Sequence, residues 1–139
     1  MHAPRYLHTM LRVRDLQAML GFYCGLLGMH ELRRIEFAAQ RYTLVFIGYG
    51  DGRDDPQLEL WHDWGDSPPA APAAGAATEA ERHLGHLGFG VRDIEGCVRK
   101  LAARGVAVRR APAPMRPGGR VIALLADPEG NEVELLASD

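Results

Sequence analysis

Apolar and polar residues follow the same series of patterns twice along the 139-residue chain, once in each half. In each half a strand-like stretch comes first, a segment with apolar residues at helical spacing follows, and three more strand-like stretches complete the series. The predicted strands are Tyr6–Val13, His30–Phe37, Tyr42–Tyr49 and Gln57–His62 in the first half and, after one that opens at Leu84, Val106–Arg109, Arg120–Ala126 and Asn131–Leu136 in the second. The pattern predicts two βαβββ modules.

Each predicted helix begins after an aspartate and ends at a glycine. Asp15 and Gly28 delimit the first helix, and Asp93 and Gly105 delimit the second. Aspartate is a favoured N-cap residue, and glycine is the commonest residue just past a helix C-terminus. The sequence Asp127-Pro128-Glu129-Gly130 has proline at the second position of a turn, which predicts a hairpin between the last two strands.

A sequence repeat begins at His8 and again at His86. Each histidine is followed, after four residues, by Val-Arg-Asp, and each module ends in an apolar strand that contains a glutamate. Glu59 stands 51 residues after His8, and Glu134 stands 48 residues after His86. Repetition at a long interval indicates two copies of one structural unit. Each copy therefore supplies one histidine and one glutamate at matching places.

These two histidines and two glutamates are predicted to bind one divalent metal ion. A lone histidine or glutamate on a strand is usually an ordinary core or surface residue, but here both recur at equivalent points. A carboxylate turned into the concave face of a sheet is costly unless it is paired or coordinated. Two imidazoles and two carboxylates suit a borderline ion such as Ni²⁺, Co²⁺, Zn²⁺, Mn²⁺ or Fe²⁺. Two further positions of an octahedral shell would stay open to a substrate with two neighbouring oxygens.

Composition and charge narrow the function classes. The formal net charge of −2 shows no basic excess, which argues against a nucleic-acid or anionic-membrane partner. No apolar run is long enough for a signal peptide or a membrane span, so we expect a soluble cytoplasmic protein. Cys24 and Cys97 lack metal-like or redox-like spacing and are expected to be buried free thiols. The Pro- and Ala-rich stretch 66–82 predicts a linker between module one (5–65) and module two (83–139) of a single domain.

Segments along nearly the whole chain resemble the vicinal-oxygen-chelate superfamily and, within it, the glyoxalase I (lactoylglutathione lyase) family. The matching segments are His8–Val13, Phe22-Tyr23, Leu26–Met29, Phe46–Gly50, Leu58–Leu60, Trp64-Gly65, Gly85-His86, Asp127–Gly130 and Glu132–Leu135. The resemblance implies an α+β fold in which the two modules form a cupped mixed sheet. It also implies a homodimer in which each site combines module one of one chain with module two of the other.

The activity implied by the resemblance is isomerisation of the hemithioacetal of methylglyoxal and glutathione to S-lactoylglutathione, which detoxifies methylglyoxal. His8, Glu59, His86 and Glu134 fall on the metal ligands of the family. The metal would act as a Lewis acid that stabilises a cis-enediolate, with Glu134 as the main base. Glu59 would face it across the metal as the second catalytic carboxylate, for the other diastereomer or for the return of the proton. The first ligand is histidine rather than the glutamine of the zinc-dependent branch, and module one lacks the insertions of that branch. Both features resemble the branch activated by Ni²⁺ or Co²⁺; Zn²⁺ is the alternative.

The substrate-binding positions implied by the resemblance are Arg12, Asp63, Arg82, Arg110 and Arg116. Arg12 and Arg82 fit arginines that bind glutathione carboxylates, whereas the last two arginines align only loosely. One segment departs from the family: Leu-Thr, one residue and Asn-Trp-Gly usually follow the metal glutamate, but this chain has Leu60-Trp61-His62-Asp63-Trp64-Gly65. An ionised Asp63 only accepts hydrogen bonds, so it would repel the γ-glutamyl carboxylate but could hold the amino group.

Two alternatives stay open. Another metalloenzyme of the same fold, such as an epimerase, an extradiol dioxygenase or a thiol transferase, would act on a different thiol or substrate. Epimerases usually carry glutamine where His8 stands, and the other two kinds keep three protein ligands, so Glu59 argues against them. A metal-free module of the bleomycin-resistance kind would sequester a ligand without chemistry and would have no reason to keep four ligand-type residues.

Overall fold

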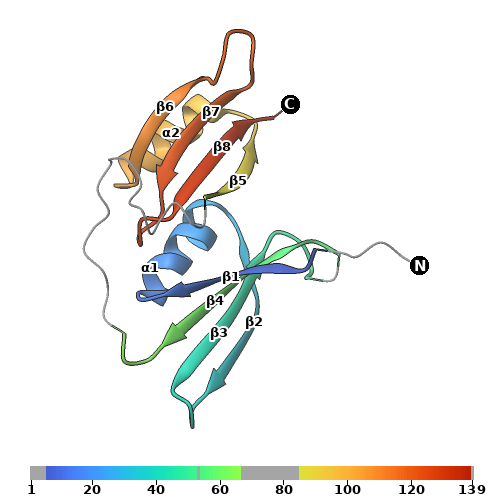
Figure 1. Cartoon of the computed structure of the whole chain (residues 1–139), viewed down its shortest axis with the longest axis vertical. Helices are drawn as coiled ribbons and strands as arrows, with labels where there is room; N and C mark the ends of the chain where they lie inside the picture. Colours follow the sequence, from blue (N-terminus) through green and yellow to red (C-terminus); the bar gives the residue numbers. More distant parts are fainter. Residues whose placement is uncertain (1–5, 53, 67–84, 139) are drawn as a thin grey trace. The chain divides into compact units, whose positions relative to one another are not determined.

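The computed structural model describes residues 6–52, 54–66 and 85–138. The chain divides into two units, one within residues 1–69 and the other within residues 70–139, and each has the predicted βαβββ order (Figure 1). The predicted linker 66–82 lies outside the described residues except for Asp66. The boundaries of the two predicted modules therefore stay a prediction.

The first unit forms a four-stranded mixed sheet. Strand β1 (His8–Val13) leads into helix α1 (Leu16–Leu20) and its π-helical continuation η1 (Gly21–Leu26). Strands β2 (His30–Phe37), β3 (Tyr42–Gly48) and β4 (Gln57–Asp63) follow. Their order in the sheet is β1-β4-β3-β2, with β1 and β4 parallel and the other neighbours antiparallel. The first and last strands of the unit are therefore neighbours.

The second unit repeats this arrangement. Its elements are β5 (His86–Val91), α2 (Ile94–Ala103), β6 (Ala107–Pro114), β7 (Val121–Ala126) and β8 (Glu132–Ala137). The sheet order is β5-β8-β7-β6, again with the first and last strands parallel. Helix α2 packs against β6, β7 and β8. Two βαβββ units, each with a mixed sheet, confirm the predicted fold class.

The predicted helix signals are also confirmed. An Oδ1 atom of Asp15 accepts a hydrogen bond from the amide of Ala18 at 3.0 Å, and Asp93 caps α2 in the same way through Gly96 at 2.9 Å. Gly28 and Gly105 have positive φ angles of 77° and 86°, which a residue without Cβ adopts at little cost.

The first helix differs from the prediction in its second half. From Gly21 to Leu26 the backbone is π-helical, and the amide of Leu27 donates to the carbonyl oxygen of Phe22, five residues earlier, at 3.0 Å. A π turn holds one residue more than an α turn and is usually confined to a short stretch. The apolar periodicity predicts a helix here, but it does not distinguish the two forms.

Several strand bounds differ from those predicted, most of them by one residue, and the differences are larger in β1 and β6. Strand β1 begins at His8, two residues after the predicted start at Tyr6. Strand β6 runs to Pro114, well past the predicted end at Arg109. Irregularities in its pairing with β7 fall between Val108 and Ala113, where Pro112 has no amide hydrogen for the ladder. Prolines argue against a strand in a sequence, but an irregular pairing accommodates them.

The thiols are less buried than predicted. Cys24 lies in η1 and Cys97 in α2, both without a disulfide, and both are half-buried rather than buried. Burial raises the pKa of each thiol, and a nearby carboxylate, Glu31 or Asp93 respectively, raises it further. Both thiols therefore stay protonated at neutral pH.

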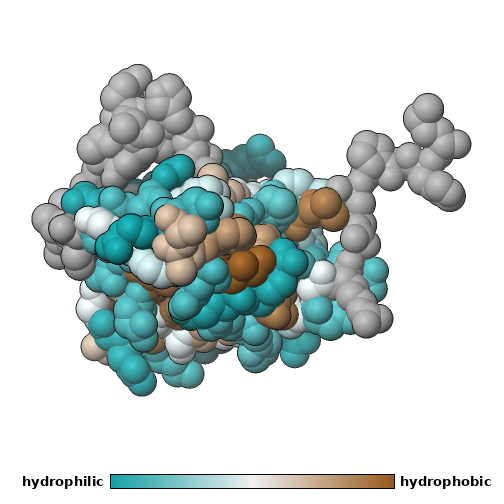
Figure 2. Space-filling view, turned by 90° about the horizontal axis from the view of Figure 1, so that it is seen from below, coloured by the Kyte–Doolittle hydropathy of each residue, from teal (hydrophilic) through white to brown (hydrophobic). Residues whose placement is uncertain are grey.

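The visible surface is mainly polar. Figure 2 shows a face on which a small group of hydrophobic side chains is surrounded by hydrophilic ones. In the described part of the chain, every helix is too short or too polar to span a bilayer. The cytoplasmic location expected from the sequence stays a prediction.

Candidate metal centre

Each unit brings one histidine and one glutamate together. His8 Nε2 lies 3.1 Å from Glu59 Oε2, and His86 Nε2 lies 3.5 Å from Glu134 Oε2. We call these pairs the first and the second half-site. Both histidine side chains are 44% exposed, and the glutamate side chains are 12% and 15% exposed. The sequence repeat therefore corresponds to two pairs with nearly the same geometry and burial.

The strand register explains why the pairs match. In the parallel pair β1–β4, His8 is opposite Gln57, and Glu59 is two residues further along β4. In β5–β8, His86 is opposite Glu132, and Glu134 is again two residues further along. Side chains two residues apart on a strand point to the same face. Histidine and glutamate of each half-site thus share one face of their sheet.

The half-sites fit a divalent metal ion. Two adjacent ligands that each bond to one ion at about 2.0–2.2 Å lie about 2.8–3.1 Å from each other in octahedral geometry and about 3.3–3.6 Å in tetrahedral geometry. The separations of 3.1 and 3.5 Å agree with this spacing, and the longer one exceeds a good hydrogen bond. Among the described residues, no three His, Cys, Asp or Glu side chains form a ligand group, so each half-site holds two of the four predicted ligands.

A cavity of about 440 Å³ adjoins the first half-site within its own unit. Its lining includes His8, Phe46 and Arg33, together with Asp51 and Asp55. The ring of Phe46 meets the His8 imidazole edge to face at 6.0 Å between centroids, and the guanidinium of Arg33 lies 4.4 Å from the centre of the Phe46 ring. These contacts place an aromatic ring beside the histidine and a cation over that ring.

Arg33 was not among the predicted site residues. It is opposite Phe46, which is opposite Glu59, and in the second unit Arg110 is likewise opposite Leu124, which is opposite Glu134. Both arginines follow an irregularity in strand pairing, and both stand five residues after the glycine that ends the helix. That shared interval is the signal that could have identified Arg33.

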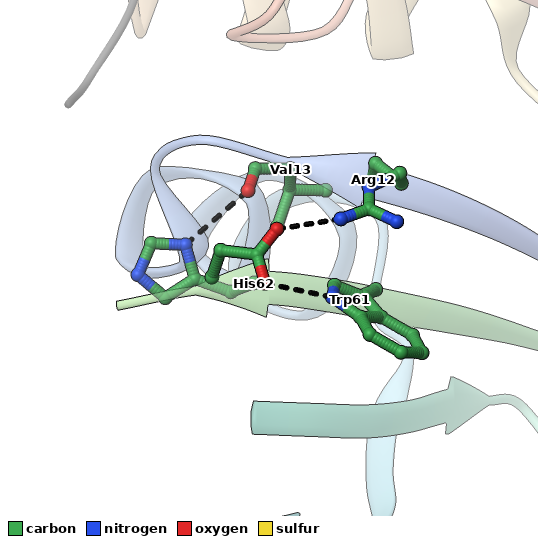
Figure 3. A network of polar contacts seen from close by, with 5 residues as sticks. Arg12, Val13, Trp61 and His62 are labelled. Atoms are coloured by element: carbon green, nitrogen blue, oxygen red, sulfur yellow. Dashed lines mark hydrogen bonds and ion pairs between the residues drawn. The ribbon is translucent and has the colours of Figure 1, made fainter. Parts of the chain in front are cut away.

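Arg12 and Asp63 are joined by an ion pair on the face of the first half-site. Arg12 Nη2 donates to Asp63 Oδ2 at 2.6 Å, and Trp61 Nε1 donates to Asp63 Oδ1 at 3.1 Å. The Arg12 guanidinium also lies over the indole, 5.0 Å from its centre (Figure 3). The hydrogen bond from Trp61 and then that from Arg12 lower the pKa of Asp63. The arginine expected to meet a carboxylate of the thiol therefore already faces one from its own chain.

Aromatic rings extend this cluster across the sheet. The Trp61 indole stacks on Tyr42 at 4.1 Å with an angle of 8° between the rings, and Tyr42 stacks on Phe37 at 4.6 Å. The row runs from Arg12 on β1 through β4 and β3 to β2. On β4, His62 Nδ1 lies 3.2 Å from the carbonyl oxygen of Val13, which joins the ends of β4 and β1 (Figure 3).

Two of the remaining predicted substrate-binding residues, Arg110 and Arg116, lie among the described residues of the second unit. Arg110 lies on β6 of the second unit, where Nη2 donates to the carbonyl oxygen of Pro114 at 3.1 Å and Nη1 contacts Met115 Sδ at 3.0 Å. Arg116 is exposed in the turn that follows β6. Arg82 lies outside the described residues. Their predicted roles stay predictions.

Known proteins resemble this chain over nearly its whole length. It is 38% identical over 130 residues to a protein of Synechocystis sp. named probable lactoylglutathione lyase, with 94% of this chain and 92% of that protein covered. It is 37% identical over 137 residues to a lactoylglutathione lyase of Neisseria meningitidis, with 95% and 89% covered.

A solved structure agrees with these sequence matches. The trypanothione-dependent glyoxalase I of Leishmania major superimposes with a TM-score of 0.77 at 33% identity, covering 97% of this chain and 87% of that one. A profile of the Glyoxalase/Bleomycin resistance protein/Dioxygenase superfamily matches residues 5–135. The chain belongs to the Glyoxalase/Bleomycin resistance protein/Dioxygenase superfamily and, within it, to the group of the lactoylglutathione lyases.

Proposed function

We propose that this protein is a metal-dependent glyoxalase I that isomerises the hemithioacetal of methylglyoxal and glutathione to S-lactoylglutathione. The observation that carries the proposal is the pair of equivalent half-sites, His8–Glu59 and His86–Glu134, in a chain similar to lactoylglutathione lyases over nearly its whole length. A binding module without chemistry gives no reason for two such matched pairs.

The four side chains of the half-sites would hold the metal ion. When bound, the ion supplies Lewis-acid polarisation of two neighbouring substrate oxygens. Glu134 takes the proton from the carbon that bears sulfur and returns it to the adjacent carbon, so that the product has the same composition as the substrate. Its side chain is only 15% exposed, which limits the contact of that proton with bulk water. Glu59 faces it as the carboxylate of the other half-site.

The proposal includes a homodimer and a preferred metal. The first half-site of one protomer would combine with the second half-site of its partner, so that a dimer has two active sites with two-fold symmetry. Ni²⁺ or Co²⁺ would activate better than Zn²⁺. The support for this choice is the histidine, rather than glutamine, at position 8.

Metal-free protein titrated separately with Ni²⁺, Co²⁺ and Zn²⁺, and assayed with methylglyoxal and glutathione, tests this function. We expect metal-dependent thioester formation, and about 10³-fold lower turnover in Glu134→Gln with retained fold. Glu132→Gln is the matched control, because Gln57 stands at the equivalent place opposite His8 in the first unit. Metal binding without turnover would show a different substrate, and neither binding nor turnover would show a sequestering module.

A further inference from the structure

We infer that the cavity beside the first half-site binds the carbon chain of the aldehyde substrate and selects α-oxoaldehydes whose chain carries hydroxyl groups. Arg33 would donate hydrogen bonds to these hydroxyl groups, and the carboxylates of Asp51 and Asp55 would accept hydrogen bonds from them. The inference rests on the proposed function and deepens it by naming a substrate class, since methylglyoxal has only a methyl group at this place.

The cavity is much larger than a methyl group. Its volume is about 440 Å³, and His8 is part of its lining, so it opens beside one of the proposed metal ligands. A group of the size of a water molecule takes about 30 Å³ in a liquid. The cavity therefore has room for several carbon and oxygen atoms beyond the reacting carbons. A substrate whose two oxygens lie at the half-site can extend its chain into this space.

The polar lining of the cavity contains both hydrogen-bond donors and hydrogen-bond acceptors. Arg33 contributes a guanidinium, and Asp51 and Asp55 contribute carboxylates. A guanidinium only donates hydrogen bonds and an ionised carboxylate only accepts them, whereas a hydroxyl group does both. The two carboxylates disfavour an anionic chain, and the guanidinium disfavours a cationic one. A neutral hydroxylated chain is therefore the class that matches both kinds of group.

Arg33 is available for such a ligand. Among the described residues, no hydrogen bond or ion pair engages its guanidinium, which lies 4.4 Å from the centre of the Phe46 ring. The equivalent Arg110 of the second unit instead donates to the carbonyl oxygen of Pro114 at 3.1 Å. The contact with the ring holds the Arg33 guanidinium beside the cavity and leaves its N–H donors for a ligand.

The two carboxylates lie on a connection that is longer than its counterpart in the second unit. Residues 49–56 connect β3 to β4, whereas only residues 127–131 connect β7 to β8. The Gln57 side chain donates to a backbone carbonyl oxygen of the longer connection at 2.7 Å, and the Asp55 carboxylate occupies the place that a Cβ atom on Gly50 would need. The second unit folds with the shorter turn, so the added charged residues point to ligand recognition rather than to folding.

Calorimetric binding of three glutathione thioethers to the metal-loaded protein tests the inference without requiring turnover. The probes have the form GS–CH₂–CO–R, in which R is ethyl, 1,2-dihydroxyethyl or 2-carboxyethyl. They lack the hydroxyl group on the carbon that bears sulfur, so they cannot become a thioester. We expect the dihydroxyethyl probe to bind the wild-type protein about 10- to 100-fold more tightly than the ethyl probe, the range for a hydrogen bond to a charged group. The carboxyethyl probe should bind no more tightly than the ethyl probe.

Arg33→Met keeps a long side chain against the Phe46 ring but removes the donors, so the dihydroxyethyl and ethyl probes should then differ less than about threefold in affinity. Arg34→Met is the matched control, because this neighbouring arginine is held in an ion pair at 2.6 Å and does not line the cavity. Asp55→Ala should also reduce the preference, whereas Asp54→Ala, at an exposed aspartate outside the cavity lining, should not.

The inference is overturned if the wild-type protein binds the ethyl and dihydroxyethyl probes equally, or if the carboxyethyl probe binds most tightly, because Arg33 then recognises an anion. It is also overturned if Arg33→Met keeps the preference, or if none of the probes binds. Turnover of methylglyoxal with glutathione, measured on the same preparation, decides separately on the proposed function. A preference for hydroxyl groups in a protein without this turnover would support the cavity and refute the isomerase, so the two failures are distinguishable.

Discussion

Glu59 and Glu134 occupy the same register position in two separate sheets, each two residues beyond the strand partner of its unit's histidine. In the proposed function, each active site combines one half-site of each kind. Variants of the two glutamates therefore offer a way to determine which chains contribute to a site.

Mixing Glu59→Gln and Glu134→Gln protomers should restore activity. Each variant alone has a damaged carboxylate in every site and should be inactive. If sites are shared between protomers, a mixed dimer has one site with both substitutions and one intact site. After random exchange of subunits we expect about one quarter of wild-type activity, measured with methylglyoxal and glutathione.

Mixing the same two variants without subunit exchange, under conditions where the dimers stay associated, is the control and should give no activity. If activity is still absent after exchange has been verified by mass spectrometry of labelled protomers, each site lies within one chain, contrary to the proposal.

The pKa of Asp63 should rise when its donors are removed. Its hydrogen bonds to Trp61 and Arg12 favour the ionised form, so Trp61→Phe and Arg12→Gln should each move the pKa toward that of an ordinary aspartate. Carbon NMR of the Asp63 carboxyl during an acid titration measures this directly. An unchanged titration midpoint in both variants would contradict the hydrogen bonds described here.

The lowered pKa of Asp63 also determines how the stability of the folded protein depends on pH. A carboxyl whose pKa is lower in the folded state stabilises that state above the ordinary carboxyl pKa, and it loses the contribution as the pH falls through the lowered value. Asp63 is well exposed, so we expect the effect on unfolding to be small and the NMR titration to be the better readout.

Asp127→Ala should destabilise the second unit. The buried Asp127 carboxylate accepts hydrogen bonds from the amides of Glu129 and Asn131, each at 2.9 Å, and from Asn131 Nδ2 at 2.8 Å. Removing it leaves these donors without their partner in the turn before β8. We expect a loss of about 2–4 kcal/mol in the free energy of unfolding, measured with urea.

Asp66→Ala provides the comparison, because that side chain is exposed and should change stability by less than about 0.5 kcal/mol. Equal unfolding midpoints for the two variants would show that the Asp127 contacts contribute little.

The half-sites could be predicted from the sequence because their signal is repeated. One histidine before Val-Arg-Asp carries little information. Two such histidines at equivalent points, each followed by a strand with a glutamate, indicate a repeated unit in which each histidine pairs with the glutamate of its own unit. The βαβββ fold then places the first strand of each unit beside its last strand, β1 beside β4 and β5 beside β8. Both His–Glu pairs were expected, and the structure brings the members of each pair together.

The cluster around Asp63 could not be predicted in the same way. Arg12 and Asp63 are 51 residues apart, and their contact depends on the register of β1 against β4, which alternation alone does not fix. Arg33 was missed for a related reason: the pairing irregularity beside it changes which side chains of β2 face the half-site. The register of the contact needs the structure, although the position of Arg33 could have been found from the five-residue interval that it shares with Arg110.

The π-helical stretch Gly21–Leu26 also accounts for a length difference between the halves. Gly28 stands 13 residues after Asp15, whereas Gly105 stands 12 residues after Asp93, so the first half holds one residue more between matching landmarks. The wider turn absorbs this insertion before β2 begins, and the strands after it keep their alignment with the other copy. Single-residue gains during divergence of the two halves could thus accumulate in a helix without displacing a metal-binding side chain.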